Sequence, residues 1–385
     1  MEFHAWLNPF RAISHQRFSS VSEENIALRH PEWTFTYGQT RYFDPGRPEV
    51  RDHLTQVVME LARGYDLDGL HFDDYFYPYR EAGLRIQDDS TFARYGAGFA
   101  DRHAWRRHNV DTFIATLSDS LRSVAPHLKF GISPVGIWRN RSDDPRGSNS
   151  RAGQTSYDDL YADVRLWLER GWIDYVAPQL YWGMTHPYAP YGELMPWWAE
   201  NAFGRHVYIG HALFKLESPG GRHWDNPTEL QTQLRLNLRQ DAIRGSIFFS
   251  AKAFRQQPRE VQALLRHERF RLPALLPPMP WKDSIPPLAP RHLEATAQGT
   301  QTQLSWQPPF VAADGDSAWQ YVIYRFRGQG RIDLDDPGRI LGLTRAPTFL
   351  DWGREPDQAY TYVVTTLDRL DNESRTGTAC YFSPE

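Results

Sequence analysis

Short apolar runs alternate with segments of helical spacing through the first two thirds of the chain. Buried parallel strands are short continuous hydrophobic runs, whereas a helix repeats its apolar positions about every three or four residues. Six runs predict strands, at residues 3–7, 67–72, 129–136, 173–182, 206–214 and 246–250. The segments between and after them predict helices, at residues 48–63, 105–124, 157–170, 197–203, 227–243 and 260–266. This alternation favours a parallel sheet with helical crossovers.

Polar and aromatic residues follow these strands repeatedly, which is typical of the catalytic face of a (β/α) barrel. A closed barrel of this kind has about eight strands, and six are predicted here. We therefore expect an α/β fold, a (β/α)8 TIM-type barrel that lacks its first two strand–helix units. The first predicted strand, Phe3–Leu7, should be buried, and the open sheet should leave two unpaired edges.

The pattern changes at Leu272–Pro290, which contains seven prolines and predicts a semi-rigid linker. Short strands follow at Leu304–Trp306, Tyr321–Arg325 and Tyr360–Leu367, separated by turn-like Asp-Gly and Asp-Asn clusters. These features predict a small β-sandwich. The expected organisation is a barrel domain at residues 1–271, a linker at 272–290 and an all-β domain at 291–385.

Composition narrows the possible partners. The formal net charge of -4 and pI near 6.4 provide no basic surface for nucleic acid. Cys380 is the only cysteine, which excludes an intrachain disulfide and a cysteine-based metal site. No stretch is apolar enough to span a membrane, and Met1–His4 runs into a strand without the features of a signal peptide. The 14 Trp, 19 Tyr and 21 Phe suit a core, and equally a cleft that stacks on sugar rings.

The densest candidate chemistry lies in the stretch Tyr65–Tyr79, where an apolar run ends in Asp73 and Asp74 among several rings. Because side chains alternate along a strand, His71 and Tyr75 should point the same way as Asp73. Asp74 should start on the other side unless the chain turns there. Two unpaired buried carboxylates are costly, which favours a functional role. The structural alternative is that one aspartate caps the next element or binds an arginine.

Five blocks of sequence resemble the bacterial glycosyl-hydrolase-like family 10, also called the domain-of-unknown-function 187 family. They are FHAWLNPFR at 3–11, HPEW at 30–33, DGLHFDDYFYPY at 68–79, GISPVGIWRN at 131–140 and YVAPQLYW at 175–182. The resemblance covers roughly residues 1–270 and implies a (β/α)8 barrel in a secreted or lipid-anchored protein. The family includes an enzyme that cleaves peptidoglycan glycan strands stripped of their stem peptides. A polysaccharide partner and a periplasmic or extracellular location are therefore implied.

Two further features accompany this resemblance. The family's barrel begins upstream of its HAWLNP-type block, which forms the third strand, yet Met1 stands just before that block here. We therefore expect either a misassigned start or a truncated chain. The C-terminal part looks like a fibronectin type III domain, on the three strand segments given above and on Asp371–Ser374. A spacer or attachment role is expected for it.

Glycoside cleavage normally uses two carboxyl groups, a proton donor and a nucleophile or base. The strand-end position of Asp73 predicts the nucleophile or base. Asp74 is the first candidate for the acid, followed by Glu32 and Asp144 in neighbouring loops. A surface salt bridge explains Glu32 equally well, and a turn explains Asp144 better.

Other strand-end residues suit sugar binding. Hydrogen bonds to hydroxyls are expected from Asn8, His71, Arg139, Asn140 and Gln179. Stacking faces are expected from Trp6, Tyr75, Trp138, Tyr181 and Trp182. Barrel filling is an equal alternative for Trp6. His211 fits the cleft or the core equally well.

The leading hypothesis is a bacterial cell-envelope glycoside hydrolase without a cofactor or metal. A glycan-binding protein with a catalytically dead or incomplete barrel is the first alternative. A metal-dependent hydrolase using His71, Asp73 and Asp74 is the second, disfavoured because the strand ends offer no further His or Cys ligand. The sequence leaves open the glycosidic linkage, retention or inversion, the identity of the acid and the oligomeric state.

Overall fold

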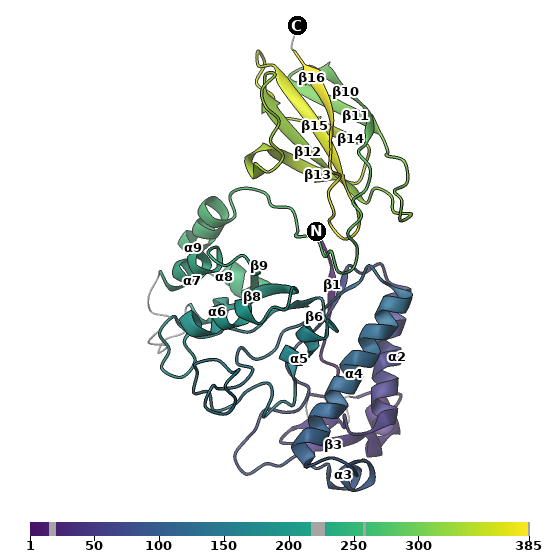
Figure 1. Cartoon of the computed structure of the whole chain (residues 1–385), viewed down its shortest axis with the longest axis vertical. Coiled ribbons are helices and arrows are strands. Elements are labelled where there is room, and N and C mark those ends of the chain that lie inside the picture. The colour runs from purple at the N-terminus through teal and green to yellow at the C-terminus, as the bar shows by residue number, and fades with distance from the viewer. Residues whose placement is uncertain (15–20, 217–227, 257–258, 384–385) are drawn as a thin grey trace. The chain divides into compact units, whose positions relative to one another are not determined.

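The computed structural model of the chain describes residues 1–14, 21–216, 228–256 and 259–383 (Figure 1). The chain forms two compact units, Met1–Arg259 and Glu260–Glu385. Unit 1 contains the parallel sheet and its helices, and unit 2 contains antiparallel sheets. No helix among the described residues combines the length and the apolar character needed to cross a lipid bilayer.

Within the described residues, unit 1 has a six-stranded sheet in the order β1-β5-β6-β7-β8-β9. The strands are β1 (His4–Leu7), β5 (Gly69–Phe72), β6 (Lys129–Ile132), β7 (Tyr175–Val176), β8 (His206–Ala212) and β9 (Ile243–Phe249). Every pairing is parallel, with Leu7 opposite Phe72 and Phe72 opposite Ile132. The predicted parallel sheet with helical crossovers is confirmed.

Helices of unit 1 cover one face of this sheet, where buried side chains of α2 (Pro48–Gly64), α4 (Arg102–Val124), α5 (Val164–Glu169) and α6 (Tyr191–Glu200) join the main core. The other described helices of unit 1 are α1 (Ile26–Arg29), α3 (Asp89–Tyr95), α7 (Glu229–Asn237) and α8 (Ala251–Gln256), whereas α9 (Arg259–Ala263) lies almost wholly in unit 2. Pro48 occupies the first turn of α2, where no N–H is needed, and the Asp101 side chain caps α4 by accepting from the Ala104 N–H. Phe72 of β5 stacks on Phe113 of α4 at 6.0 Å between ring centroids. This outward face forms the main core.

The opposite face of the sheet is an inner, concave face. Gly131 of β6 lies under the Tyr175 ring, and a Cβ added at Gly131 would meet that ring at 2.0 Å. Trp6 of β1 and Phe249 of β9 stand on the two edge strands, yet their ring centroids are 5.9 Å apart. The sheet therefore curls until its two edges approach, as an open half-barrel.

Two strand predictions need correction. β1 is not buried: Trp6 is 59% exposed, because β1 is an edge strand whose partner among the described residues is β5 alone. The strand expected over residues 173–182 forms a ladder only at Tyr175–Val176. Pro178 has no N–H to donate, and beyond it Gln179 pairs through isolated bridges with Val135 and Gly210.

Two helix predictions also need correction. The helix expected over residues 157–170 begins only at Val164, after Tyr161 adopts a left-handed φ of 55°. Asp163 then caps it by accepting from the Leu166 N–H at 3.2 Å. The helix expected at 197–203 begins earlier, since α6 starts at Tyr191 and ends at Glu200.

The connection between β1 and α2 contains a small antiparallel sheet that the sequence pattern did not predict. Its order is β2-β4-β3, with β2 at Arg11–Ile13, β3 at Thr34–Tyr37 and β4 at Thr40–Phe43. A 3-10 turn at Pro31–Trp33 precedes β3, and another at Leu213–Lys215 follows β8. β3 and α3 lie at the lower end of unit 1 in Figure 1.

Unit 2 packs a three-stranded sheet, β10-β11-β14, with a four-stranded sheet, β13-β12-β15-β16. The strands are β10 (Arg291–Gln298), β11 (Gln301–Gln307), β12 (Gln320–Arg327), β13 (Ile340–Thr344), β14 (Thr348–Asp351), β15 (Tyr360–Leu367) and β16 (Thr378–Phe382). All pairings are antiparallel. The three predicted strands are confirmed, because they lie within β11, β12 and β15. Asp283 of the proline-rich stretch accepts a hydrogen bond from the Asn372 amide at 3.1 Å.

Candidate active site

The inner face of the sheet presents polar side chains next to one another. Leu70 and Phe72 of β5 point into the core, so His71 and Asp73 alternate onto the inner face. The Tyr175 hydroxyl lies 3.0 Å from His71 Nδ1 and 2.8 Å from His4 Nδ1. Burial lowers the pKa of His71 to about 4, so its ring is neutral at ordinary pH. His71 is therefore fixed by Tyr175 below the carboxyl end of β5.

Asp73 is buried at the end of β5 with only two described donors. The Asn8 amide donates to Asp73 Oδ2 at 3.1 Å, and the Tyr75 N–H lies 3.4 Å from Oδ1. Asn8 is itself positioned because the Arg11 N–H donates to its Oδ1 at 3.2 Å. Burial, and after it the charge of Asp74, raises the pKa of Asp73 to about 6. A carboxyl group with this pKa exchanges its proton near neutral pH.

Asp74 lies beside it because the chain turns directly after β5. The Tyr79 hydroxyl donates to Asp74 Oδ2, and the Gln179 side chain also hydrogen-bonds the carboxylate. Gln179 is held in turn by donating to the Ser133 carbonyl at 3.0 Å. Burial raises the pKa of Asp74, and the bonds from Tyr79 and Gln179 oppose that rise.

Arg11 and Tyr79 are site residues that the sequence analysis did not select. The Arg11 guanidinium lies 3.8 Å from the centre of the Tyr75 ring, and its charge lowers the pKa of both Asp73 and Asp74. Both residues lie within quoted sequence blocks. Their contacts depend on turns after β1 and β5, which residue type alone does not reveal.

The predicted stacking residues differ in their surroundings. Tyr75 lies under Arg11 beside Asp73, and Trp6 is largely exposed on β1. Tyr181 is half-buried, and burial followed by the charge of Asp74 raises its pKa. Trp182 is half-buried against the core, where its carbonyl accepts from the Gln233 amide at 3.1 Å.

Three predicted binding residues after β6 instead hold their own loop together. Trp138 is buried, donates to Asp163 at 2.9 Å and stacks on Trp197. Arg139 binds both oxygens of Asp158, at 2.8 and 2.9 Å. Asn140 is buried and bonds Ala152 through both its amide and its carbonyl.

His211 and Glu32 lie outside the described contacts of Asp73 and Asp74. His211 is fully buried between Gln233 and Ser246, each 3.1 Å from a ring nitrogen. Burial lowers its pKa to about 4, which makes it a neutral core histidine. Glu32 is exposed in the turn before β3 and pairs with His30 at 3.0 Å.

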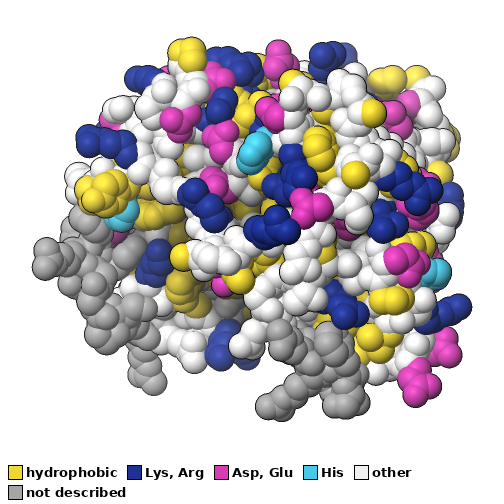
Figure 2. Space-filling view, turned by 90° about the horizontal axis from the view of Figure 1, so that it is seen from below, with side chains coloured by type: hydrophobic (Ala, Val, Ile, Leu, Met, Phe, Trp, Pro, Cys, Tyr) yellow, Lys and Arg dark blue, Asp and Glu magenta, His cyan; other side chains and the backbone are white. Residues whose placement is uncertain are grey.

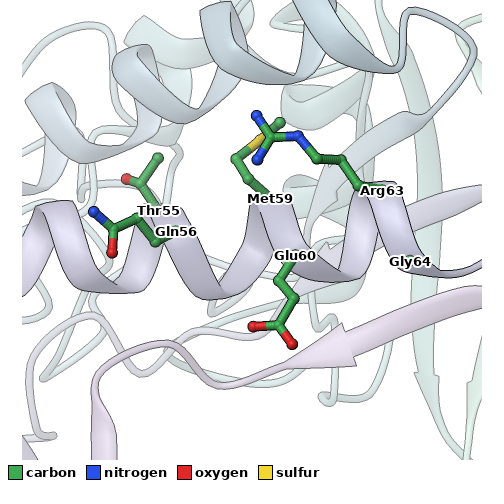
Figure 3. Close-up of a pocket in the computed structure, with 6 residues that line it drawn as sticks. All are labelled: Thr55, Gln56, Met59, Glu60, Arg63 and Gly64. Carbon is green, nitrogen blue, oxygen red and sulfur yellow. The ribbon is translucent and has the colours of Figure 1, made fainter.

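Other surface features do not add to this cluster. An open concavity on α2 is lined by Thr55, Gln56, Met59, Glu60, Arg63 and Gly64. Figure 3 shows the Glu60 carboxylate and the Arg63 guanidinium pointing to opposite sides of the helix, so they do not act together. On the face seen in Figure 2, basic and acidic side chains are interspersed.

Among the residues that the structure describes, the carboxylates placed to share a metal ion lie in unit 2. They are Asp283, Asp316 and Asp368, with ligand atoms within 4.8 Å of one another. His71 is directed to Tyr175, so the trio proposed for a metal in unit 1 does not converge.

Comparison with known proteins identifies relatives of this chain. Glycosyl hydrolase YngK of Bacillus subtilis is 39% identical over 381 residues, which are 97% of this chain and 74% of that protein. Glycosyl hydrolase DigH of Escherichia coli K12 is 39% identical over 280 residues, which are 69% of this chain but only 63% of DigH.

A solved glycoside hydrolase domain, that of PgaB from Bordetella bronchiseptica, is 14% identical with a TM-score of 0.43. The similarity covers 68% of this chain and 73% of that one. The family model described as glycosyl hydrolase-like 10 matches residues 1–226, more than half of the chain. The chain therefore belongs to the glycosyl hydrolase-like 10 family.

Proposed function

We propose that this protein is a glycoside hydrolase that acts on peptidoglycan glycan strands or a related polysaccharide of the bacterial cell envelope. The observation that supports it most is the adjacent pair Asp73–Asp74, buried at the carboxyl end of β5 with raised pKa values. Two carboxyl groups in different hydrogen-bonding environments supply the proton donor and the charged group that glycoside cleavage requires.

The surroundings favour Asp73 as the proton donor, which reverses the roles expected from the sequence. Its pKa near 6 keeps a protonated fraction available at neutral pH. Asp74 accepts hydrogen bonds from Tyr79 and Gln179, which favour the ionised form and hold it as the charged partner. Glu32 is a weaker proposal for either role because its exposed carboxylate pairs with His30.

The substrate and location rest on the sequence resemblance, which implies peptide-free peptidoglycan and a periplasmic or extracellular protein. On the same basis we propose unit 1 as a TIM-type barrel without two of its strand–helix units. The three- and four-stranded antiparallel sheets of unit 2 support a fibronectin type III-like spacer at residues 291–385, preceded by a linker at residues 272–290.

A non-catalytic glycan-binding protein is the second candidate. Its support is the open sheet, because β1 and β9 each have an unpaired edge within the described residues. An open barrel holds its strand-end loops less firmly than a closed one, and catalysis is more sensitive to such loosening than binding is.

Hydrolysis of purified, peptide-free peptidoglycan strands tests this proposal. The chain should release reducing sugar ends, and Asp73→Asn should lower the rate by about 10²–10⁴-fold. Asp119→Asn, on the exposed side of α4, is the matched control and should keep the parent rate. Binding of the strands without hydrolysis by the parent chain would favour the glycan-binding candidate, and neither binding nor hydrolysis would contradict both.

A further inference from the structure

Four aromatic rings form a continuous row on the inner side of unit 1. Trp6 meets Phe249 at 5.9 Å between ring centroids, Phe249 meets Phe214 at 6.1 Å, and Phe214 meets Tyr181 at 5.7 Å. The four residues come from β1, β9, the turn after β8 and the segment after β7. The row thus spans the gap between the two edge strands.

The rings of this row are unusually open to solvent. Trp6 is 59% exposed, Phe249 and Phe214 are each 43% exposed, and Tyr181 is half-buried. Contiguous exposed apolar surface is uncommon unless a ligand or partner covers it. Each contact is edge to face, at 85°, 88° and 85°, so neighbouring rings hold one another, and part of each ring remains exposed.

One end of the row lies beside the carboxylate pair. The charge of Asp74 acts on the Tyr181 hydroxyl, while Asp74 itself is bonded to Gln179, two residues before Tyr181. Lys215 donates to the Tyr181 carbonyl at 2.6 Å, and its ammonium lies 5.9 Å from the Phe214 ring. Polar groups that can hydrogen-bond a hydroxyl therefore lie at the Tyr181–Phe214 end of the row.

We propose that Trp6, Phe249, Phe214 and Tyr181 form an aromatic row that binds successive pyranose units of a glycan chain and leads it to Asp73. This inference rests on the proposed function. It adds the place where the part of the glycan outside the cleavage point is bound. The apolar faces of pyranose rings pack on aromatic faces, and their hydroxyls take hydrogen bonds from polar groups at the edge.

Binding to the full chain carrying Asp73→Asn, which separates binding from cleavage, tests the aromatic row. The ligands are a disaccharide and an octasaccharide of the peptide-free peptidoglycan backbone, titrated by calorimetry. Phe249→Leu and Phe214→Leu keep an apolar side chain but remove the flat face. Each should weaken octasaccharide binding about tenfold and leave disaccharide binding nearly unchanged.

Two controls keep the result interpretable. Phe249→Trp keeps a flat ring and should retain octasaccharide affinity. Tyr65→Leu removes an exposed ring just after α2, before β5 begins, and should change nothing. Circular dichroism of each variant checks that unit 1 remains folded.

Three outcomes would overturn the aromatic row. Unchanged octasaccharide binding in both leucine variants would overturn it while leaving the proposed function in place. Binding of neither ligand by the Asp73→Asn chain, together with no hydrolysis by the parent, would remove the proposed function as well. A parent dimer that Phe249→Leu dissociates in sedimentation would show that the rings bind a second copy of the chain instead.

Discussion

Two carboxylate-rich segments follow neighbouring strands of the sheet, one after β5 and the other after β6, and they differ in how their carboxylates are paired. After β5, Asp73 and Asp74 are buried with raised pKa values, and the charge of Asp74 contributes to the raised pKa of Asp73. After β6, Asp144 binds Arg146 and Arg139, and these contacts hold the pKa of Asp144 well below its usual range. Asp158 is likewise matched by Arg139.

This difference indicates that pairing with arginine distinguishes a structural carboxylate from a carboxylate of the candidate site. A carboxylate with its own arginine gains stability in the ionised form and gives up its proton only in strong acid. A buried carboxyl group held by neutral donors beside a like charge has a raised pKa and keeps a protonated fraction near neutral pH. Aspartates follow both strands, so the difference between their pKa values comes from the groups that each aspartate contacts.

After the loss expected for Asp73→Asn, the largest expected effect comes from Asp74→Asn. It removes the charge that helps to raise the pKa of Asp73, so hydrolysis should fall about 10²–10³-fold and its alkaline limb should move to lower pH. A pH profile of kcat/KM on peptide-free glycan strands measures both effects. Asp158 pairs with Arg139 in the loop after β6, so Asp158→Asn should keep the parent pH profile. An equal loss of hydrolysis in this variant would contradict the difference drawn between the two segments.

Asn140→Ala tests whether the loop after β6 is a scaffold. Asn140 binds Asp143, Ser150 and Ala152, so its removal should lower the free energy of unfolding of unit 1 by about 2–3 kcal/mol. Urea unfolding followed by tryptophan fluorescence measures the change, with Asn149→Ala as the exposed control. Lost hydrolysis at parent stability would instead place Asn140 among the substrate-binding residues.

Asp111→Asn asks whether a raised pKa alone marks a functional site. Burial, and after it Asp163, raises the pKa of Asp111 from 3.8 to about 7, although its carboxylate only accepts from the Trp167 indole at 2.6 Å. Folding therefore loses stability as pH rises from about 4 to 7, where the unfolded carboxyl is ionised and the folded one is not. We expect the asparagine variant to gain about 1–3 kcal/mol at pH 8 and nearly nothing at pH 4. Thermal unfolding at the two pH values checks this, and a pH-independent gain would contradict the cause given.

The smallest expected effect is that of Tyr79→Phe. It removes one hydrogen bond from Asp74 and keeps the ring that packs on Tyr75, so hydrolysis should fall about three- to tenfold. Tyr65→Phe, on an exposed tyrosine, is the matched control. A loss as large as that of Asp74→Asn would give the hydroxyl itself a place in the chemistry.

The apolar spacing of the sequence by itself located the strands of unit 1, because local periodicity reports which faces of nearby residues are buried, and their alternation with helices favoured a parallel sheet. Leu70 and Phe72, for example, identified β5, and their alternation gave the side on which Asp73 lies. The pattern also identified β11, β12 and β15 of unit 2.

Only the tertiary structure decided which polar residues became a candidate site. Asn8 reaches Asp73 across 65 residues of sequence, and Gln179 reaches Asp74 from the far side of β6. Partners 19 and 22 residues away in sequence paired with Asp158 and hydrogen-bonded His211 in the core. Hydrogen bonds and ion pairs between distant loops depend on where the sheet brings the loops together, and residue order alone does not contain those distances.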